Sequence, residues 1–379
     1  MIGKGWQLFK LLGFSVRVDA SWLIIAVLVI WSLRIGFFPH FYPDLAETAY
    51  LGMAIAGALG LFLSIVFHEL AHSLVARRTG VEMRGITLFV FGGVAEMEGE
   101  PPSPAAEFNI AVIGPIASAL LAAVSFGIWA VGQQQGWHEP TVGVFLYLGV
   151  INGLLAAFNM VPAFPLDGGR IARSLLWWFL GSLRKATAVT STMGSLFAML
   201  LIVAGVLVLV QGNVIGGVWW ILLGLFLRTA AAGSYQQLLV RRVLQGEPIR
   251  RFMQPNVQTV EPSTSIQDFV DNYVYRFHFK MFPVIEDGRL AGQVTTRSIQ
   301  EVPREEWQNR RVAEFIEPCR DCNLIDPDAD ALEVLSQMHR HGVSRMLVAR
   351  DGQLEGVISL KDMMRLIAFK LELEADEGT

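Results

Sequence analysis

Two histidines and a glutamate lie within five residues of one another in an otherwise apolar stretch. His68 and His72 are four positions apart, and residues at i and i+4 share one face of an α-helix, so both imidazoles can bind one metal ion. Glu69 stands where a general base would activate water. A lone histidine in a membrane helix is more often a packing residue, but three neighbouring ionisable groups are costly in lipid. The spacing therefore predicts a functional zinc site.

The zinc site needs a further ligand, because a catalytic zinc usually has three protein ligands and a position open to water. The best candidate is Asp167, which follows Pro162 and Pro165 at the end of another apolar segment. Prolines interrupt a helix, and we expect this break to bring the carboxylate to the depth of the histidines. The alternative is a solvated aspartate in a simple turn, and it would be preferred if this segment stood alone.

The composition places these residues in a membrane. Hydrophobic residues make up 53% of the 379 residues and charged residues 17%, whereas a soluble domain has about 25% charged residues. The net charge of −4 argues against a nucleic-acid partner. Six segments are long and apolar enough to span a bilayer; they cover residues 20–38, 51–76, 107–131, 142–161, 187–211 and 214–235.

The basic residues predict how these segments are oriented. They precede the first segment and follow the second, the fourth (Arg170 and Arg173 among them) and the sixth, whereas the connections 39–50 and 132–141 have none. Since loops rich in Lys and Arg stay in the cytoplasm, we expect a multi-pass protein of the cell membrane with both termini cytoplasmic. Arg34 is the exception, and it can reach the outer interface by snorkelling.

The C-terminal part is polar and contains an internal repeat. Phe252-Met-Gln-Pro255 recurs as Phe315-Ile-Glu-Pro318, and each copy contains an Asp-Gly hairpin between two short strands. The sequence therefore predicts three domains; they are a membrane domain at 1–240 and two repeats at 249–305 and 311–372.

The two membrane motifs together resemble those of the site-2 protease family of intramembrane zinc metalloproteases. The likeness rests on His-Glu-x-x-His in the second apolar segment and on Asn-x-x-Pro-x-x-Pro-Leu-Asp-Gly at the end of the fourth. The resemblance implies that His68, His72 and Asp167 bind one Zn²⁺ and that Glu69 is the general base. It implies that Asn159 polarises the scissile carbonyl or binds the oxyanion, and that the substrate is a membrane-spanning protein.

The stretch from Ile86 to Glu96 is rich in β-forming residues and is interrupted by Gly92-Gly93. It resembles the re-entrant β-hairpin of the same family. Non-helical backbone is tolerated at membrane depth only where protein or water covers it, and a strand edge there can pair with an unwound substrate. A plain cytoplasmic hairpin is the alternative.

The C-terminal repeat resembles a tandem pair of cystathionine-β-synthase (CBS) domains, which often bind adenine nucleotides. Ser359 and Asp362 of the second copy match the ribose-binding positions of that family, whereas the first copy has Thr295 and, in place of the aspartate, Ser298. The resemblance implies one nucleotide site, with ATP as the expected ligand, rather than two. The alternative is a module that serves only to form a homodimer.

Two functions of different classes fit these features. One is a regulated intramembrane zinc endopeptidase, and the other is an ion or metal transporter gated by CBS domains. A transporter favours polar residues spread along a pore, whereas the ionisable residues here are concentrated in two motifs, so the endopeptidase is preferred. The predicted fold is a multi-pass α-helical membrane protein with six transmembrane helices and a membrane-associated β-hairpin, followed by a cytoplasmic α/β tandem CBS module.

Overall fold

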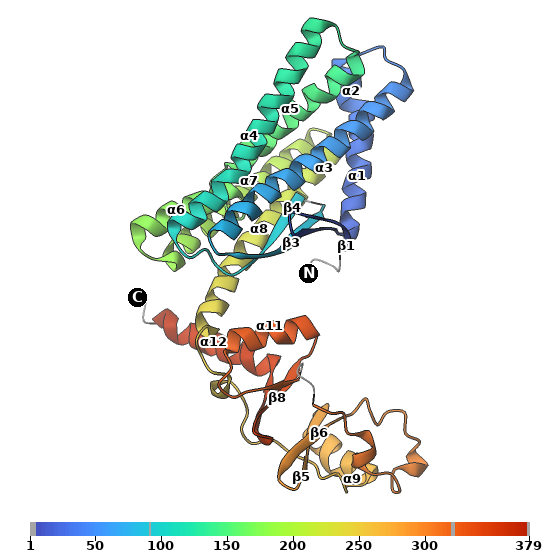
Figure 1. Cartoon of the computed structure of the whole chain (residues 1–379), viewed down its shortest axis with the longest axis vertical. Helices are drawn as coiled ribbons and strands as arrows, with labels where there is room; N and C mark the ends of the chain where they lie inside the picture. Colours follow the sequence, from blue (N-terminus) through green and yellow to red (C-terminus); the bar gives the residue numbers. More distant parts are fainter. Residues whose placement is uncertain (1–4, 91, 320–322, 377–379) are drawn as a thin grey trace. The chain divides into compact units, whose positions relative to one another are not determined.

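The computed structural model describes residues 5–90, 92–319 and 323–376 (Figure 1). The chain divides into two compact units, Met1–Gln236 and Gln237–Thr379, and each is described by itself. The division falls within helix α8 (Val214–Leu244), whereas the boundary expected from sequence stands at residue 240.

Within the described residues, six helices are long and apolar enough to cross a membrane, as the six apolar segments predict. Helices satisfy their backbone hydrogen bonds internally, which lipid requires. The first span begins with α1 (Ala20–Ser32) and continues through a π-helical turn into α2 (Phe38–Phe41). The others are α3 (Glu47–Arg78), α4 (Pro104–Gln135), α5 (Glu139–Asn159), α7 (Leu183–Val210) and α8.

Glycines allow α3, α4 and α5 to pack closely side by side (Figure 1). A Cβ atom added to Gly60 of α3 would lie 2.6 Å from Leu148 of α5, and one added to Gly149 of α5 would lie 2.8 Å from the ring of Phe126 on α4. Small residues have this role in membrane helices, where close backbone approach increases the van der Waals contact. These contacts fix α3, α4 and α5 against one another.

A four-stranded sheet with the order β1-β2-β3-β4 packs against α3. Strands β3 (Glu82–Phe89) and β4 (Gly92–Glu98) are antiparallel and form the hairpin predicted for 86–96. Strands β1 (Trp6–Leu11) and β2 (Phe14–Val18) form a second hairpin that the sequence analysis did not predict, and β2 runs parallel to β3.

The break expected after the fourth segment is present. Helix α5 ends at Asn159, and α6 (Asp167–Leu180) begins directly at the aspartate. The turn between them contains a cis peptide bond before Pro165. It is compact because a Cβ atom on Gly168 would lie 2.3 Å from the carbonyl oxygen of Met160. The Gly-Gly pair therefore lets the turn fold back against the first residues of α6.

The second unit consists of two small α/β repeats, as expected. The first repeat has an antiparallel pair of strands and short helices; they are β5 (Met281–Glu286), β6 (Arg289–Thr295), α9 (Ile266–Phe269) and α10 (Tyr275–Phe277). The second has three strands and two longer helices; they are β7 (Leu324–Ile325), β8 (Arg345–Arg350), β9 (Gln353–Ser359), α11 (Ala331–His341) and α12 (Leu360–Asp376).

Each repeat begins with a short segment, here called its leading segment, that packs against the other repeat. Gln254, which precedes the first repeat's helices and strands, forms backbone hydrogen bonds with Val357 of β9 in the second repeat. In the same way, Glu317 pairs with Gln293 of β6 in the first repeat. The cores follow this pattern, because Phe252 lies in the second repeat's hydrophobic core. The units that repeat in the sequence are therefore not the units that pack together.

Candidate metal centre

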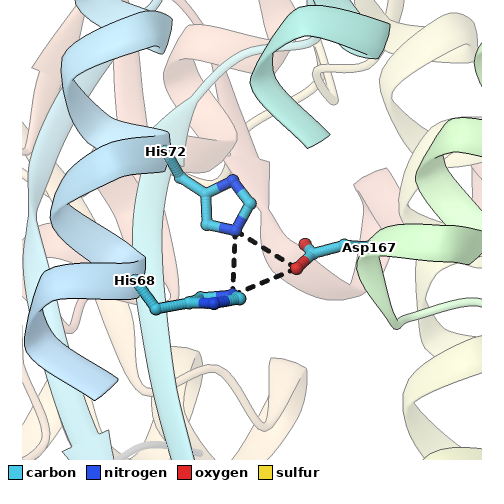
Figure 2. A group of neighbouring side chains, drawn as sticks. All are labelled: His68, His72 and Asp167. Atoms are coloured by element: carbon cyan, nitrogen blue, oxygen red, sulfur yellow. Dashed lines mark hydrogen bonds and ion pairs between the residues drawn. The ribbon is translucent and has the colours of Figure 1, made fainter. Parts of the chain in front are cut away.

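The side chains of His68, His72 and Asp167 point toward one another (Figure 2). The Nε2 atoms of the two histidines, both on α3, are 3.1 Å apart. Oδ2 of Asp167, in the first turn of α6, is 3.1 Å from Nε2 of His68 and 3.2 Å from Nε2 of His72. All three residues are buried, with 4%, 4% and 9% of their surface exposed. The structure thus brings together the three ligands expected from sequence.

Two oxygen atoms of helix α4 form hydrogen bonds with the Nδ1 atoms of the imidazole rings. Nδ1 of His72 lies 2.6 Å from the carbonyl oxygen of Ile110, and because a carbonyl only accepts, Nδ1 donates. In the neutral ring Nε2 then keeps its lone pair for a metal. Nδ1 of His68 lies 2.9 Å from Oγ of Ser118. Histidines that bind a metal characteristically use their other ring nitrogen in this way, which fixes the ring orientation.

The resulting group of atoms fits a zinc ion. Burial alone raises the pKa of the Asp167 carboxyl, but the two imidazoles lower it overall, so this side chain is an ionised acceptor. When His68 donates to Ser118 as His72 donates to Ile110, three acceptor atoms face one another. They are the two Nε2 atoms and Oδ2 of Asp167, and a cation between them can bind all three. Two nitrogens and a carboxylate oxygen are typical zinc ligands, and tetrahedral zinc separates its ligand atoms by about 3.3 Å.

Helix α4 passes so close to this centre that only glycine fits at position 114. A Cβ atom added to Gly114 would lie 2.1 Å from Nε2 of His72 and 2.7 Å from Nε2 of His68. The absent side chain leaves free the space in front of the two nitrogen atoms that face the carboxylate. This role of Gly114 was not predicted from the sequence, where the small residues around Pro115 indicate only close helix packing.

Glu69 lies between α3 and the sheet. Its side chain is half-buried, and a Cβ atom on Gly93 of β4 would lie 2.7 Å from its Cγ and 3.1 Å from its Oε1. Among the described residues, the group of converging ligand atoms consists of the two histidines and Asp167, without Glu69. This arrangement leaves the carboxylate available for proton transfer.

Asn159 is the last residue of α5, and the structure does not bring it into the histidine–aspartate group. Its Nδ2 donates to the carbonyl oxygen of Leu155 at 3.1 Å. An asparagine amide has two N–H donors, so this hydrogen bond leaves one of them for a substrate carbonyl. The role of Asn159 in polarising that carbonyl stays a prediction.

A buried ion pair beside the centre joins α4 to α6. Nε of Arg173 donates to Oε1 of Glu107 at 2.7 Å, and Glu107 and Arg173 are 0% and 5% exposed. Oε2 of Glu100 lies 3.2 Å from Nη2 of Arg173. In the sequence, Arg173 indicates only the orientation of the chain in the membrane. Its spacing of six residues from Asp167, on a helix that starts at the aspartate, was the available signal.

The residues expected to bind a nucleotide differ between the two repeats. In the second, Oγ of Ser359 donates to the carboxylate of Asp362, whose Oδ1 also accepts from Nε2 of Gln254 at 2.8 Å. In the first, Oγ1 of Thr295 lies 3.1 Å from Oγ of Ser298 and 3.1 Å from Oε1 of Glu317.

Gln254 and Glu317 occupy equivalent places in the exchanged leading segments. In the second repeat the carboxylate at the ribose position is that of Asp362. In the first repeat the carboxylate beside Thr295 is that of Glu317, which lies on a leading segment. A cavity of about 300 Å³ lies elsewhere between the repeats and does not include Thr295, Ser359 or Asp362; its lining is Pro255, Val257, Thr259, Ile285, Gly288, Gln353 and Leu354.

Comparison with known proteins shows similarity along nearly the whole chain. Residues 56–143 and 127–203 match the model of peptidase family M50, and residues 249–305 and 312–369 match the CBS domain. The chain is 32% identical over 362 residues to a Mycobacterium tuberculosis protein named putative zinc metalloprotease Rip3. This match covers 94% of this chain and 91% of that protein. It is 29% identical over 370 residues to zinc metalloprotease MJ0392 of Methanocaldococcus jannaschii, covering 98% of each.

Among solved structures, the site-2 protease from Methanocaldococcus jannaschii is 26% identical to this chain, with a TM-score of 0.42. The match covers 60% of this chain and 94% of that one.

Replacing Gly114 with Ala tests the fit of the metal centre. The new methyl group overlaps both Nε2 atoms, so we expect zinc to fall from one ion per chain toward zero, although Ala favours the helix itself. Zinc per purified chain, measured by mass spectrometry, checks this. Gly127→Ala is the matched control, because α4 has open space there. Full zinc occupancy in Gly114→Ala would contradict the site.

Proposed function

Because the chain belongs to the site-2 protease family of zinc metalloproteases, peptidase family M50, and carries two CBS domains, we propose that it is an intramembrane endopeptidase. One zinc ion is held by His68, His72 and Asp167, and the substrate is a membrane-spanning protein cut near the cytoplasmic face. The observation that carries the proposal is the convergence of three buried acceptor atoms at distances of 3.1–3.2 Å. In the part of the chain that the structure describes, no second group of converging metal ligands supports the transporter alternative.

The proposed reaction assigns a task to each residue around the centre. Zinc, when bound, activates a water molecule and polarises the peptide carbonyl. Glu69 accepts the proton of the attacking water and passes it to the leaving amine, which suits a carboxylate that is near the ligands but separate from them. Asn159 donates its free N–H to the scissile carbonyl. Ile110 and Ser118 hold the imidazoles in orientation throughout.

Strand β4 is the proposed docking edge for the substrate. It is the last strand in the sheet order and pairs with β3 on one side; among the described residues no strand pairs with its other edge, and we propose strand addition there. Gly93 places this strand directly beside Glu69. Peptide bonds in a helix are shielded by their own hydrogen bonds, so the substrate must unwind into an extended segment before it is cut.

The orientation supports cytoplasmic access. The charge distribution predicts cytoplasmic termini in the cell membrane, and in that orientation the ligand-bearing end of α3, which closes with Arg77 and Arg78, lies near the cytoplasmic side. Hydrolysis consumes water, and this side offers it the shorter path.

The CBS pair is proposed to bind one adenine nucleotide, ATP being the expected ligand, and to regulate proteolysis. In the second repeat, Ser359 and Asp362 present a hydroxyl and a carboxylate together. In the first repeat, the nearby carboxylate belongs to Glu317 and already accepts hydrogen bonds from Thr295 and Gln293. The aspartate at the ribose position is present only in the second repeat, where the first has Ser298, and this difference supports one site per pair. A homodimer formed through this pair remains compatible with such a site.

Glu69→Gln tests the catalytic assignment. We expect cleavage of a membrane-spanning substrate in proteoliposomes to fall by about 10²–10⁴-fold, the usual contribution of a general base, while zinc stays at one ion per chain. Glu47→Gln, at the exposed start of α3, should keep both activity and zinc. Normal cleavage by the Glu69→Gln protein would rule out the metalloprotease mechanism.

The requirement for unwinding predicts how substrates differ. A substrate helix interrupted by Gly or Pro near the cytoplasmic end should be cut faster than an uninterrupted poly-Leu helix of the same length, because its segment extends at lower cost. Initial rates in proteoliposomes of one lipid composition measure this. Equal rates for the two substrates would contradict docking as an extended strand.

Nucleotide binding is tested by calorimetry on the full chain with ATP, ADP and AMP. We expect one nucleotide per chain and at least a roughly tenfold loss of affinity in Asp362→Ala, because a charge-assisted hydrogen bond is removed. Ser298→Ala, at the equivalent position of the first repeat, is the matched control and should bind as the unmodified protein does. Absence of binding at millimolar nucleotide would leave the CBS pair as a dimerisation module.

A further inference from the structure

One face of α4 carries Ile110, Gly114 and Ser118, which lie at the histidines, and it also carries Glu107. Positions 107, 110, 114 and 118 are three or four residues apart, so they lie in a row along the helix. Ile110 and Ser118 hold the imidazoles, and Gly114 leaves space in front of them. Glu107 begins this row one turn away from Ile110, and its partner is Arg173 of α6.

The facing side of α6 has a similar arrangement. Asp167, Arg170 and Arg173 follow one another at intervals of three residues, which places them on neighbouring parts of one helix face. Nε of Arg173 is 2.7 Å from Oε1 of Glu107, and Nε of Arg170 is 3.9 Å from the same oxygen. Asp167 is the first residue of its helix, so the docking of α6 on α4 determines where its carboxylate lies.

The ion pair between Glu107 and Arg173 can fix the position of α6 along α4. Both partners are shielded from solvent, and a buried charge is tolerated only when it is paired. Arginine presents its donors in a rigid planar fork, and here the fork is held by Glu107, by Glu100 and by the ring of Phe164, whose centroid is 5.1 Å from the guanidinium carbon. Apolar contacts alone would allow α6 to slide or rotate, whereas this set of contacts defines one position.

We propose that Glu107 and Arg173 are positioning residues of the metal centre. Their ion pair fixes α6 on α4 and so holds the Asp167 carboxylate against the imidazoles of His68 and His72. The inference rests on the proposed zinc site, yet neither residue is itself a ligand. It predicts that breaking the pair weakens metal binding through Asp167, in addition to any effect on the stability of the fold.

The test measures metal binding by the full-length protein in detergent, after its metal has been removed. Arg173→Met should lower zinc affinity by about 10–100-fold, the usual cost of losing a residue that orients a ligand, and should weaken the visible absorption of bound Co²⁺. Arg173→Lys keeps the charge but loses the fork, so its effect should be smaller. Arg34→Met, which breaks the exposed pair between Arg34 and Glu47, is the control and should leave zinc affinity unchanged.

A double-mutant cycle separates positioning from general stability. If Arg173 acts through Asp167, Arg173→Met should cost no further zinc affinity in a chain that already carries Asp167→Ala. An equal additional loss in that background would overturn the proposal, as would unchanged zinc affinity and Co²⁺ spectrum in folded Arg173→Met. If Asp167→Ala itself left zinc affinity unchanged, the zinc site would be wrong, and the positioning role would be wrong with it.

Folding of each variant is checked by circular dichroism and by the thermal unfolding midpoint of the metal-free protein. Should Arg173→Met fail to fold, Glu107→Gln takes its place, because it keeps the acceptor oxygen and the side-chain shape while removing the charge. It should lower zinc affinity in the same direction and should likewise have no further effect beside Asp167→Ala. Wild-type zinc affinity in folded Glu107→Gln would then overturn the proposal.

Discussion

The constraint on which the membrane unit depends is that polar atoms buried among transmembrane helices must satisfy one another. Two imidazoles and a carboxylate meet within 3.2 Å, and the Nδ1 atoms of the imidazoles are hydrogen-bonded to Ile110 and Ser118 of α4. A polar group buried there without a partner would be costly. This arrangement requires two features of the surrounding chain. Glycine must occupy position 114, where α4 approaches the histidines, and α6 must begin at Asp167.

The sequence predicted the parts of this unit that are encoded locally. The spacing of His68 and His72, the length of the apolar segments and the prolines before Asp167 are each contained in a short window, and the structure agrees with all of them. It did not predict the pair of Glu107 and Arg173, which are 66 residues apart. Such a pairing depends on how two helices dock, and neither helix signals its partner by itself.

The second unit shows the same limit in another form. The repeat and its Asp-Gly hairpins are visible in the sequence, but the exchange of leading segments is not, because it concerns which repeat each segment packs against. Exchange has a chemical consequence. It brings Gln254 to Asp362 and Glu317 to Thr295, so substitutions in one repeat determine the polarity of the site in the other. Reading each copy alone detects the change at Ser298 but not the Glu317 carboxylate that accepts a hydrogen bond from Thr295.

The N-terminal hairpin, which the sequence analysis missed, explains how a strand edge can be held beside Glu69. Strand β4 must keep one edge open if it is to receive a substrate, so its support has to come from the other side of the sheet. Strands β1 and β2 extend the sheet there, and Val16 and Ile86 are buried together against Val66 of α3. Gly93 then closes the distance to Glu69. Helix α3 thus carries the two histidine ligands, the base and the support for the proposed docking strand, which ties substrate position to the zinc site.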